Sequence, residues 1–322
     1  MFNDDQLYAN GRIAVLSTRL LSQDKFVRLS ECKTLVEALK VLYENGYGSG
    51  ITVQNPNDYE IILRAELDTA MGALKELCYD RNALKFLLCK YDYLNAKTLM
   101  KGKYLREDFT SYCFEQANYS PREMQEAFVK DTYKGFSKAM AEACDAIDNE
   151  YANGNRSPQV IDKLLDKASY KDMRRYAKRA SSRLIYKLYD WQLNTTNLML
   201  LYRFKKAGYD KDLYSDWLIE GGSLKKQQLL SLWDDESASL DLPERYRNFY
   251  ALCNGQRSTL VLAEKEQIAE RNRLIAEYAD FLTIQPALEY FYAKVDETEK
   301  VRRVLVDVKN GVDKDKIKEK IK

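Results

Sequence analysis

The sequence contains no histidine among its 322 residues, and it has only 5 prolines and 13 glycines. Histidine is the commonest general base and the commonest metal ligand in proteins. Its absence excludes Ser-His-Asp and Cys-His catalysis and every metal site built on imidazole. Few prolines and glycines in a chain rich in Leu, Lys, Glu and Ala are typical of long helices joined by few turns.

Cysteine is also scarce, and the six cysteines show no metal-binding spacing. No two of them lie three residues apart, so the paired spacing of a zinc ribbon is missing. We expect free, mostly buried thiols rather than a disulfide framework. The six are Cys32, Cys78, Cys89, Cys113, Cys144 and Cys253.

Long hydrophobic runs are missing as well. The longest, at 84–89 and 197–204, fall far short of the roughly 20 residues that a membrane-spanning helix needs. The N-terminus is polar and acidic, unlike a signal peptide, so we expect a cytoplasmic chain. With 51 basic and 49 acidic residues, the net charge of +2 argues against a nucleic-acid-binding protein.

Apolar residues recur at helical spacing through most of the chain, which predicts an all-α fold. Thr34 followed by Glu37 is a capping box that opens a helix, and Gly46 is placed to close it. Ser120-Pro121 is a second helix start. Residues 51–53 are the only candidate for a short strand.

Two further stretches bear on helix boundaries. Residues 171–206 contain neither proline nor glycine, which predicts one long helix or two helices with a tight joint. The run Gly221-Gly222-Ser223 predicts a break followed by a helix cap.

An internal repeat of about a hundred residues runs through the sequence. Asn95 matches Asn197 at an offset of 102 residues, and Gly208 matches Gly311 at an offset of 103. This period is too long for a solenoid module and has the size of a small domain. We therefore predict three tandem, similar helical domains, at 1–113, 114–220 and 221–322.

Each copy of the repeat carries a polar pair three residues apart, followed by basic residues on the same stretch. Residues at this spacing share one face of a helix. They serve either as internal polar contacts or as contacts to a partner, and the sequence leaves both readings open. The positions are Asp92, Asn95, Lys97, Lys101, Asn194, Asn197, Arg203, Glu297, Lys300 and Arg302.

Nothing in the sequence indicates catalysis. The glycine-rich stretch at 46–50 is not followed by the Lys-Ser or Lys-Thr and the helix of a phosphate-binding loop. Carboxylates such as Glu60 and Glu66 are plentiful, but no pattern places them in an apolar pocket. We expect no catalytic residues, no cofactor and no metal.

Four stretches together resemble the C subunit of bacterial and archaeal V/A-type rotary ATPases, the counterpart of the d subunit of the eukaryotic vacuolar proton pump. They lie at 8–48, 90–103, 194–224 and 286–321, in the order that the family shows. The second includes the family's D-x-x-N-x-K pattern at Asp92, Asn95 and Lys97. The sequence departs from the family at Asn194, where an acidic residue is usual, and at Lys300, where asparagine is usual.

The resemblance implies a funnel of three similar domains around a pseudo-threefold axis. It implies a non-catalytic rotor subunit that joins the central shaft to the membrane proteolipid ring, and so couples ATP turnover to ion transport. The partners would be the shaft proteins and the ring, with this chain as a peripheral monomer inside a large hetero-oligomer. The alternative is a free-standing helical scaffold or adaptor.

Overall fold

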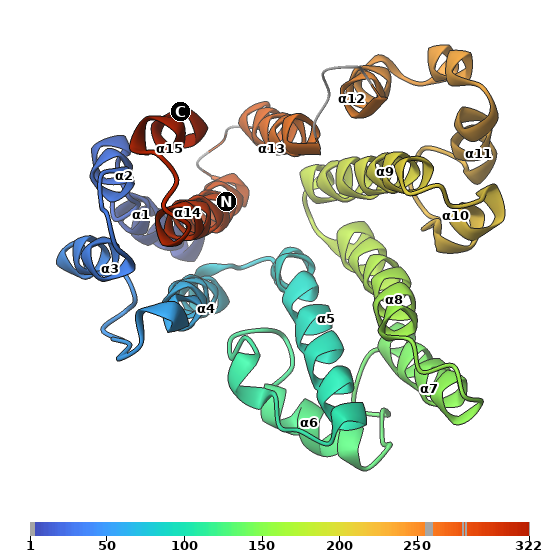
Figure 1. The fold of residues 1–322 in the computed structure, drawn as a ribbon, viewed down its shortest axis with the longest axis horizontal. Coiled ribbons are helices and arrows are strands. Elements are labelled where there is room, and N and C mark those ends of the chain that lie inside the picture. The colour runs from blue at the N-terminus through green and yellow to red at the C-terminus, as the bar shows by residue number, and fades with distance from the viewer. Residues whose placement is uncertain (1–3, 255–259, 279, 281, 322) are drawn as a thin grey trace. The chain divides into compact units, whose positions relative to one another are not determined.

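The computed structural model describes residues 4–254, 260–278, 280 and 282–321. Over these residues the chain forms helices and no strand, which confirms the predicted all-α class (Figure 1). Residues 51–53 form no strand but lie in an irregular loop. The α-helices are α1 Asp4–Ser17, α2 Gln23–Ser30, α3 Leu35–Glu44, α4 Tyr59–Leu77, α5 Arg81–Leu105, α6 Pro121–Val129, α7 Lys138–Ala152, α8 Pro158–Arg179, α9 Arg183–Lys206, α10 Lys211–Trp217, α11 Lys226–Asp234, α12 Glu244–Asn254, α13 Leu260–Ala276, α14 Gln285–Lys309 and α15 Lys314–Ile321. Short 3-10 helices lie at Pro56–Asp58, Thr110–Tyr112 and Glu236–Asp241.

The sequence signals for helix ends act as expected in several places. The Thr34 side chain accepts a hydrogen bond from Glu37 N at the start of α3, and Gly46 follows that helix with a φ of 72°. Helix α6 begins at Pro121. The stretch 171–206 is two helices with a tight joint, because α8 ends at Arg179 and α9 begins at Arg183.

The prediction for Gly221-Gly222-Ser223 is half right. The chain does break there, but Ser223 caps no helix, since α11 begins at Lys226 with Lys225 in the capping position. The Ser223 hydroxyl instead donates to Asp190 Oδ2 on α9 at 2.7 Å.

The chain forms two compact units. Unit 1 comprises Met1–Tyr79, Thr110–Pro121 and Asp280–Lys322, so it joins the first and last helices of the chain. In it, α14 packs against α1, α2, α3 and α4. Its core holds apolar residues from distant parts of the sequence, among them Phe26, Leu42, Ile62, Val304 and Ile317.

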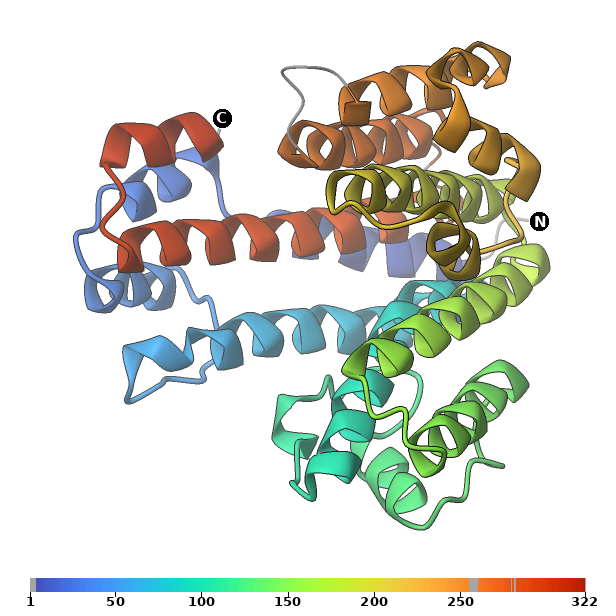
Figure 2. The same cartoon turned by 45° about the vertical axis from the view of Figure 1, so that its right-hand side comes forward.

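Unit 2 comprises Asp80–Phe109 and Arg122–Ala279. Here α5 and α7 both pack along α8, while α9 packs against α8, α12 and α13 (Figure 2). The largest fully buried side chains of this unit include Phe86, Tyr189, Tyr214 and Phe249.

The repeat seen in the sequence recurs in the helices. The longest helices, α5, α9 and α14, begin at Arg81, Arg183 and Gln285, so each begins 102 residues after the one before. Each ends in the same motif, in which one residue adopts a positive φ and the residue after it donates a backbone hydrogen bond back to a carbonyl of the last turn. These bonds are Glu107 N to Gly102 O (3.0 Å), Tyr209 N to Phe204 O (3.1 Å) and Val312 N to Asp307 O (2.9 Å).

Candidate functional site

Of the four predicted positions on α5, two are buried polar residues and two are lysines at the contact with α8. Asp92 and Asn95 are each only 1% exposed. Lys97 Nζ lies 2.7 Å from Asp166 Oδ1, and one turn later Lys101 Nζ lies 3.0 Å from Asp162 Oδ1. The two lysines therefore form a ladder of ion pairs between the helices. Because these pairs are partly exposed, each contributes at most about 1 kcal/mol.

The two asparagines on α9 hold the segment that leads into α11. Asn197 Nδ2 donates to Ile219 O at 2.8 Å, and Ile219 N donates back to Asn197 Oδ1 at 3.1 Å. Asn194 Nδ2 donates to Ser223 Oγ at 2.9 Å and to Tyr246 OH at 3.0 Å. Both side chains are buried, so in this unit they act as internal contacts.

The glycine pair makes this close approach possible. A Cβ at Gly222 would clash with Asn194 Oδ1, and Gly221 has a φ of 123°, a region that favours glycine. The backbone at Gly222 therefore lies too close to the Asn194 side chain for any other residue. This explains why the break in the helical pattern contains two glycines.

On α14, Glu297 belongs to a buried charge cluster that the sequence did not reveal. Lys294 Nζ lies 2.6 Å from Glu297 Oε1 and 3.0 Å from Glu66 Oε2 on α4. The Leu21 N–H donates to Glu297, and the Gly48 N–H donates to Glu66 at 2.6 Å. The cluster thus ties two loops and α4 to α14.

Each charged group in this cluster favours the charged form of its oppositely charged neighbours. Burial alone lowers the pKa of Lys294, but the adjoining Glu297 and Glu66 carboxylates outweigh it and raise that pKa above its usual value. Burial raises the pKa of Glu297, against the opposing effect of Lys294. Sequence could have offered one signal, a lysine and a glutamate three residues apart within a largely apolar stretch.

The other three predicted positions also make contacts within their units. Arg302 binds Glu60 through two hydrogen bonds of 2.8 and 2.9 Å. Lys300 lies over the Phe26 ring, 4.3 Å from its centroid, and burial lowers the pKa of this amine. Arg203 is about half exposed and lies 3.9 Å from Glu264. A role for any of the ten positions in binding a partner stays a prediction.

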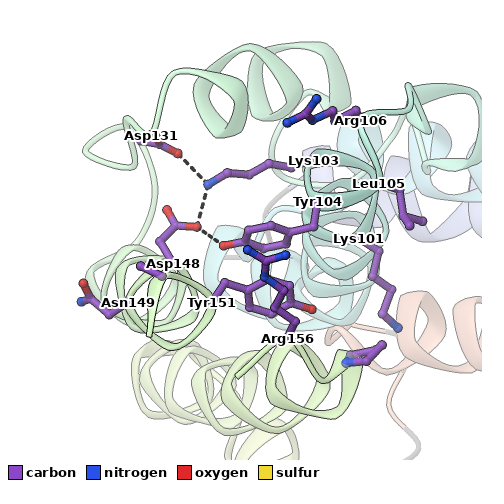
Figure 3. A pocket seen from close by; sticks show the side chains of 12 residues that line it. Lys101, Lys103, Tyr104, Leu105, Arg106, Asp131, Asp148, Asn149, Tyr151 and Arg156 are labelled. Atoms are coloured by element: carbon purple, nitrogen blue, oxygen red, sulfur yellow. Dashed lines mark hydrogen bonds and ion pairs between the residues drawn. The ribbon is translucent and has the colours of Figure 1, made fainter. Parts of the chain in front are cut away.

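The structure contains a pocket that sequence reasoning missed, at the C-terminal end of α5 in unit 2 (Figure 3). It has a volume of about 840 Å³. Its walls come from the ends of α5 and α7, the loop after α6 and the start of α8. Only Lys101 among its lining residues was singled out from the sequence. The lining residues are Lys101, Lys103, Tyr104, Leu105, Arg106, Asp131, Asp148, Asn149, Tyr151, Ala152, Arg156 and Pro158.

Asp148 is the centre of the pocket's hydrogen bonding. Lys103 Nζ lies 2.6 Å from Asp148 Oδ1 and 2.6 Å from Asp131 Oδ1. The Tyr133 hydroxyl donates to Asp148 Oδ2 at 2.5 Å, and the Tyr104 hydroxyl donates to Asp148 Oδ1. Burial and then Asp148 raise the pKa of both tyrosines, so they remain protonated donors.

Other chemistry is sparse in the part of the chain that the structure describes. Those residues contain no cluster of three or more acidic or cysteine side chains placed to bind a metal ion. The six cysteines form no disulfide bond, and all but Cys32 are buried. None of the described helices has the length and apolar character needed to cross a bilayer.

Comparison with known proteins gives one consistent result. Residues 9–320 match the family described as ATP synthase (C/AC39) subunit. The C subunit of the A-type ATP synthase of Thermococcus kodakarensis is 26% identical, over 97% of this chain and 89% of that protein. The A-type ATP synthase C subunit of Desulfurococcus sp. is 24% identical to this chain, over 97% of this chain and 89% of that protein. The one from Pyrococcus horikoshii is 25% identical, over 98% of this chain and 89% of that protein.

Proposed function

The chain belongs to the ATP synthase (C/AC39) subunit family, and from this premise we propose that it is a non-catalytic rotor subunit of a V/A-type ATPase. The observation that carries the proposal is the match over nearly the whole length, both to the family and to proteins named as the C subunit of A-type ATP synthases. In this role the chain is a socket that joins the central shaft to the membrane proteolipid ring.

A socket of this kind transmits torque, so it must be stiff. Its partners would be the shaft proteins and the ring, and the chain would lie at the cytoplasmic side of the membrane as one copy in a large hetero-oligomer. The internal ion pairs of α5 with α8 and the buried cluster on α14 support stiffness, because they fix helices and loops within each unit.

We also propose that the three copies of the repeat are arranged about a pseudo-threefold axis as a funnel, with copies at 1–113, 114–220 and 221–322. Support comes from the spacing of α5, α9 and α14 and from their shared end motif. A second support is the pattern of packing. Each of these three long helices packs against the helix that comes directly before one of the three in the sequence: α5 against α8, α9 against α13, and α14 against α4.

The test is a deletion of this chain in its host. If the chain couples ring to shaft, membranes of the deletion strain hydrolyse ATP without driving ion transport, and a plasmid copy restores transport. ATP-driven ion transport at the wild-type rate without the chain would contradict the proposal.

A further inference from the structure

Two residues with an unusual backbone conformation line the pocket at the end of α5. Within the described residues, Ser49, Arg106 and Asp131 are the non-glycine residues with positive φ, and the last two line this pocket (Figure 3). Aspartate tolerates this conformation, whereas for arginine it costs roughly 1–2 kcal/mol. Strain retained in this way points to a function at the same place.

The repeat shows that Arg106 occupies a glycine position. The residues that follow α9 and α14 in the same motif are Gly208, with a φ of 73°, and Gly311, with a φ of 65°, while Arg106 has a φ of 60°. The backbone conformation is therefore the same at all three positions, and of the three residues only Arg106 has a side chain. That side chain is a guanidinium group on the rim of the pocket.

The charges of the pocket are unbalanced. Four basic side chains and two acidic ones line it. Both acids, Asp131 and Asp148, are already bound by Lys103. Arg106 and Arg156 form no ion pair with any residue in the described part of the chain. The pocket therefore offers two guanidinium groups without an ion-pair partner, and a guanidinium group binds a carboxylate through two parallel hydrogen bonds.

The pocket also offers an aromatic surface. The rings of Tyr104 and Tyr151 stack with their centroids 3.7 Å apart and an interplanar angle of 18° (Figure 3). Leu105, Ala152 and Pro158 add apolar surface beside them. Aromatic and arginine side chains around a concave surface are the groups that dominate binding energy at protein interfaces.

We propose that this pocket binds an acidic peptide segment of a partner protein, one that presents an aromatic side chain between carboxylates. The aromatic side chain would pack beside Tyr104 and Tyr151, and the carboxylates would pair with Arg106 and Arg156. A volume of about 840 Å³ holds several residues, far more than a single small anion needs. The proposal goes beyond the rotor role, which stands or falls by the deletion experiment.

The test uses the full chain and a fluorescein-labelled peptide, Asp-Glu-Trp-Glu-Asp, followed by fluorescence polarisation. We expect binding that weakens with salt and is about tenfold weaker for the amide analogue Asn-Gln-Trp-Gln-Asn. Arg106→Gly should weaken binding by about fivefold or more. This variant restores the glycine of the other two copies, so loss of binding cannot be ascribed to unfolding.

The matched control is Arg122→Ala, which removes an arginine that is 87% exposed and lies outside the pocket. It should bind the peptide like the wild-type chain. Three results would overturn the proposal: no binding of the peptide, equal binding by Arg106→Gly, or equal binding of the amide analogue. Binding of ATP or tripolyphosphate through Arg106, without binding of the peptide, would also overturn it in favour of a phosphate ligand.

Discussion

At the scale of single residues, Lys294 is a buried charged group at the centre of the ion-pair cluster of unit 1. Its side chain is 8% exposed and stands between Glu66 and Glu297, which are 10% and 4% exposed. Two buried carboxylates share one ammonium group, and the backbone donors from Leu21 and Gly48 satisfy part of the remaining charge. Removing the ammonium would leave both carboxylates buried without a counter-charge.

Lys294→Met should therefore lower the free energy of unfolding by about 3–5 kcal/mol. Urea unfolding followed by circular dichroism measures the change. Lys138→Met is the control, because Lys138 is 89% exposed and should shift stability by less than about 0.5 kcal/mol. If Lys294→Met unfolds at the same urea concentration as the control, the cluster does not stabilise the fold.

The same cluster predicts a dependence on pH. The pKa of Lys294 is raised in the folded chain, so its stabilisation is complete below the unfolded pKa of about 10.4 and is lost as the pH rises through the folded pKa. The difference in unfolding free energy between the wild-type chain and Lys294→Met should shrink above about pH 10.4. A difference that stays constant in that range would count against the raised pKa.

Gly222 is a second position where the fold accepts only one residue type, because there is no room for a Cβ. Gly222→Ala places a methyl group against Asn194 Oδ1 and should cost about 1–3 kcal/mol, measured by thermal or urea unfolding. Gly135→Ala is the matched control, since a Cβ at Gly135 meets no atom within 4 Å. Equal stability of the two variants would show that the segment at 218–224 moves away from α9 freely.

Sequence reasoning found several of these residues without finding what they do. Asn194 and Asn197 stood out because the repeat marks them, but their partners Ile219, Ser223 and Tyr246 depend on tertiary packing. Lys294 was missed because its partner Glu66 lies 228 residues away, and no local pattern connects them. The sequence identifies the positions that are repeated, but the partners of a buried charge depend on which segments pack together in the fold.

At the scale of elements, helix starts were the most predictable features and helix partners the least. Capping at Thr34 and the start at Pro121 follow from local hydrogen bonding, so they could be predicted from a few residues. The packing of α14 against α4 depends on apolar faces at opposite ends of the chain. The pocket at the end of α5 was missed for the same reason, because it is built from four separate stretches.

The shared end motif gives a prediction at this scale. Arg106→Gly should raise the free energy of unfolding by about 0.5–1 kcal/mol, since glycine adopts a positive φ without the clash that arginine suffers there. Gly208→Arg, at the same place after α9, should lower it by a similar amount. Urea unfolding of both variants measures the pair, and a change of the same sign in both would contradict the equivalence of the two helix ends.

At the scale of the whole molecule, the repeat was the most informative sequence feature. It predicted the size of the recurring unit, and the starts of α5, α9 and α14 agree with the offset of 102 residues. The grouping of the first and last helices in unit 1 was not predicted, because the sequence order of the copies does not reveal which helices pack together.

The proposed role as a rotor subunit of a V/A-type ATPase makes this chain part of a large membrane-bound complex. The most direct test is to purify the tagged chain from host membranes in mild detergent, and to measure the native mass and the protein composition of what is recovered. If the chain is a rotor subunit, it is recovered as one copy in a very large complex that contains nucleotide-binding proteins and a proteolipid ring. Recovery of the chain as a free monomer, with those components assembled without it, would contradict the rotor role.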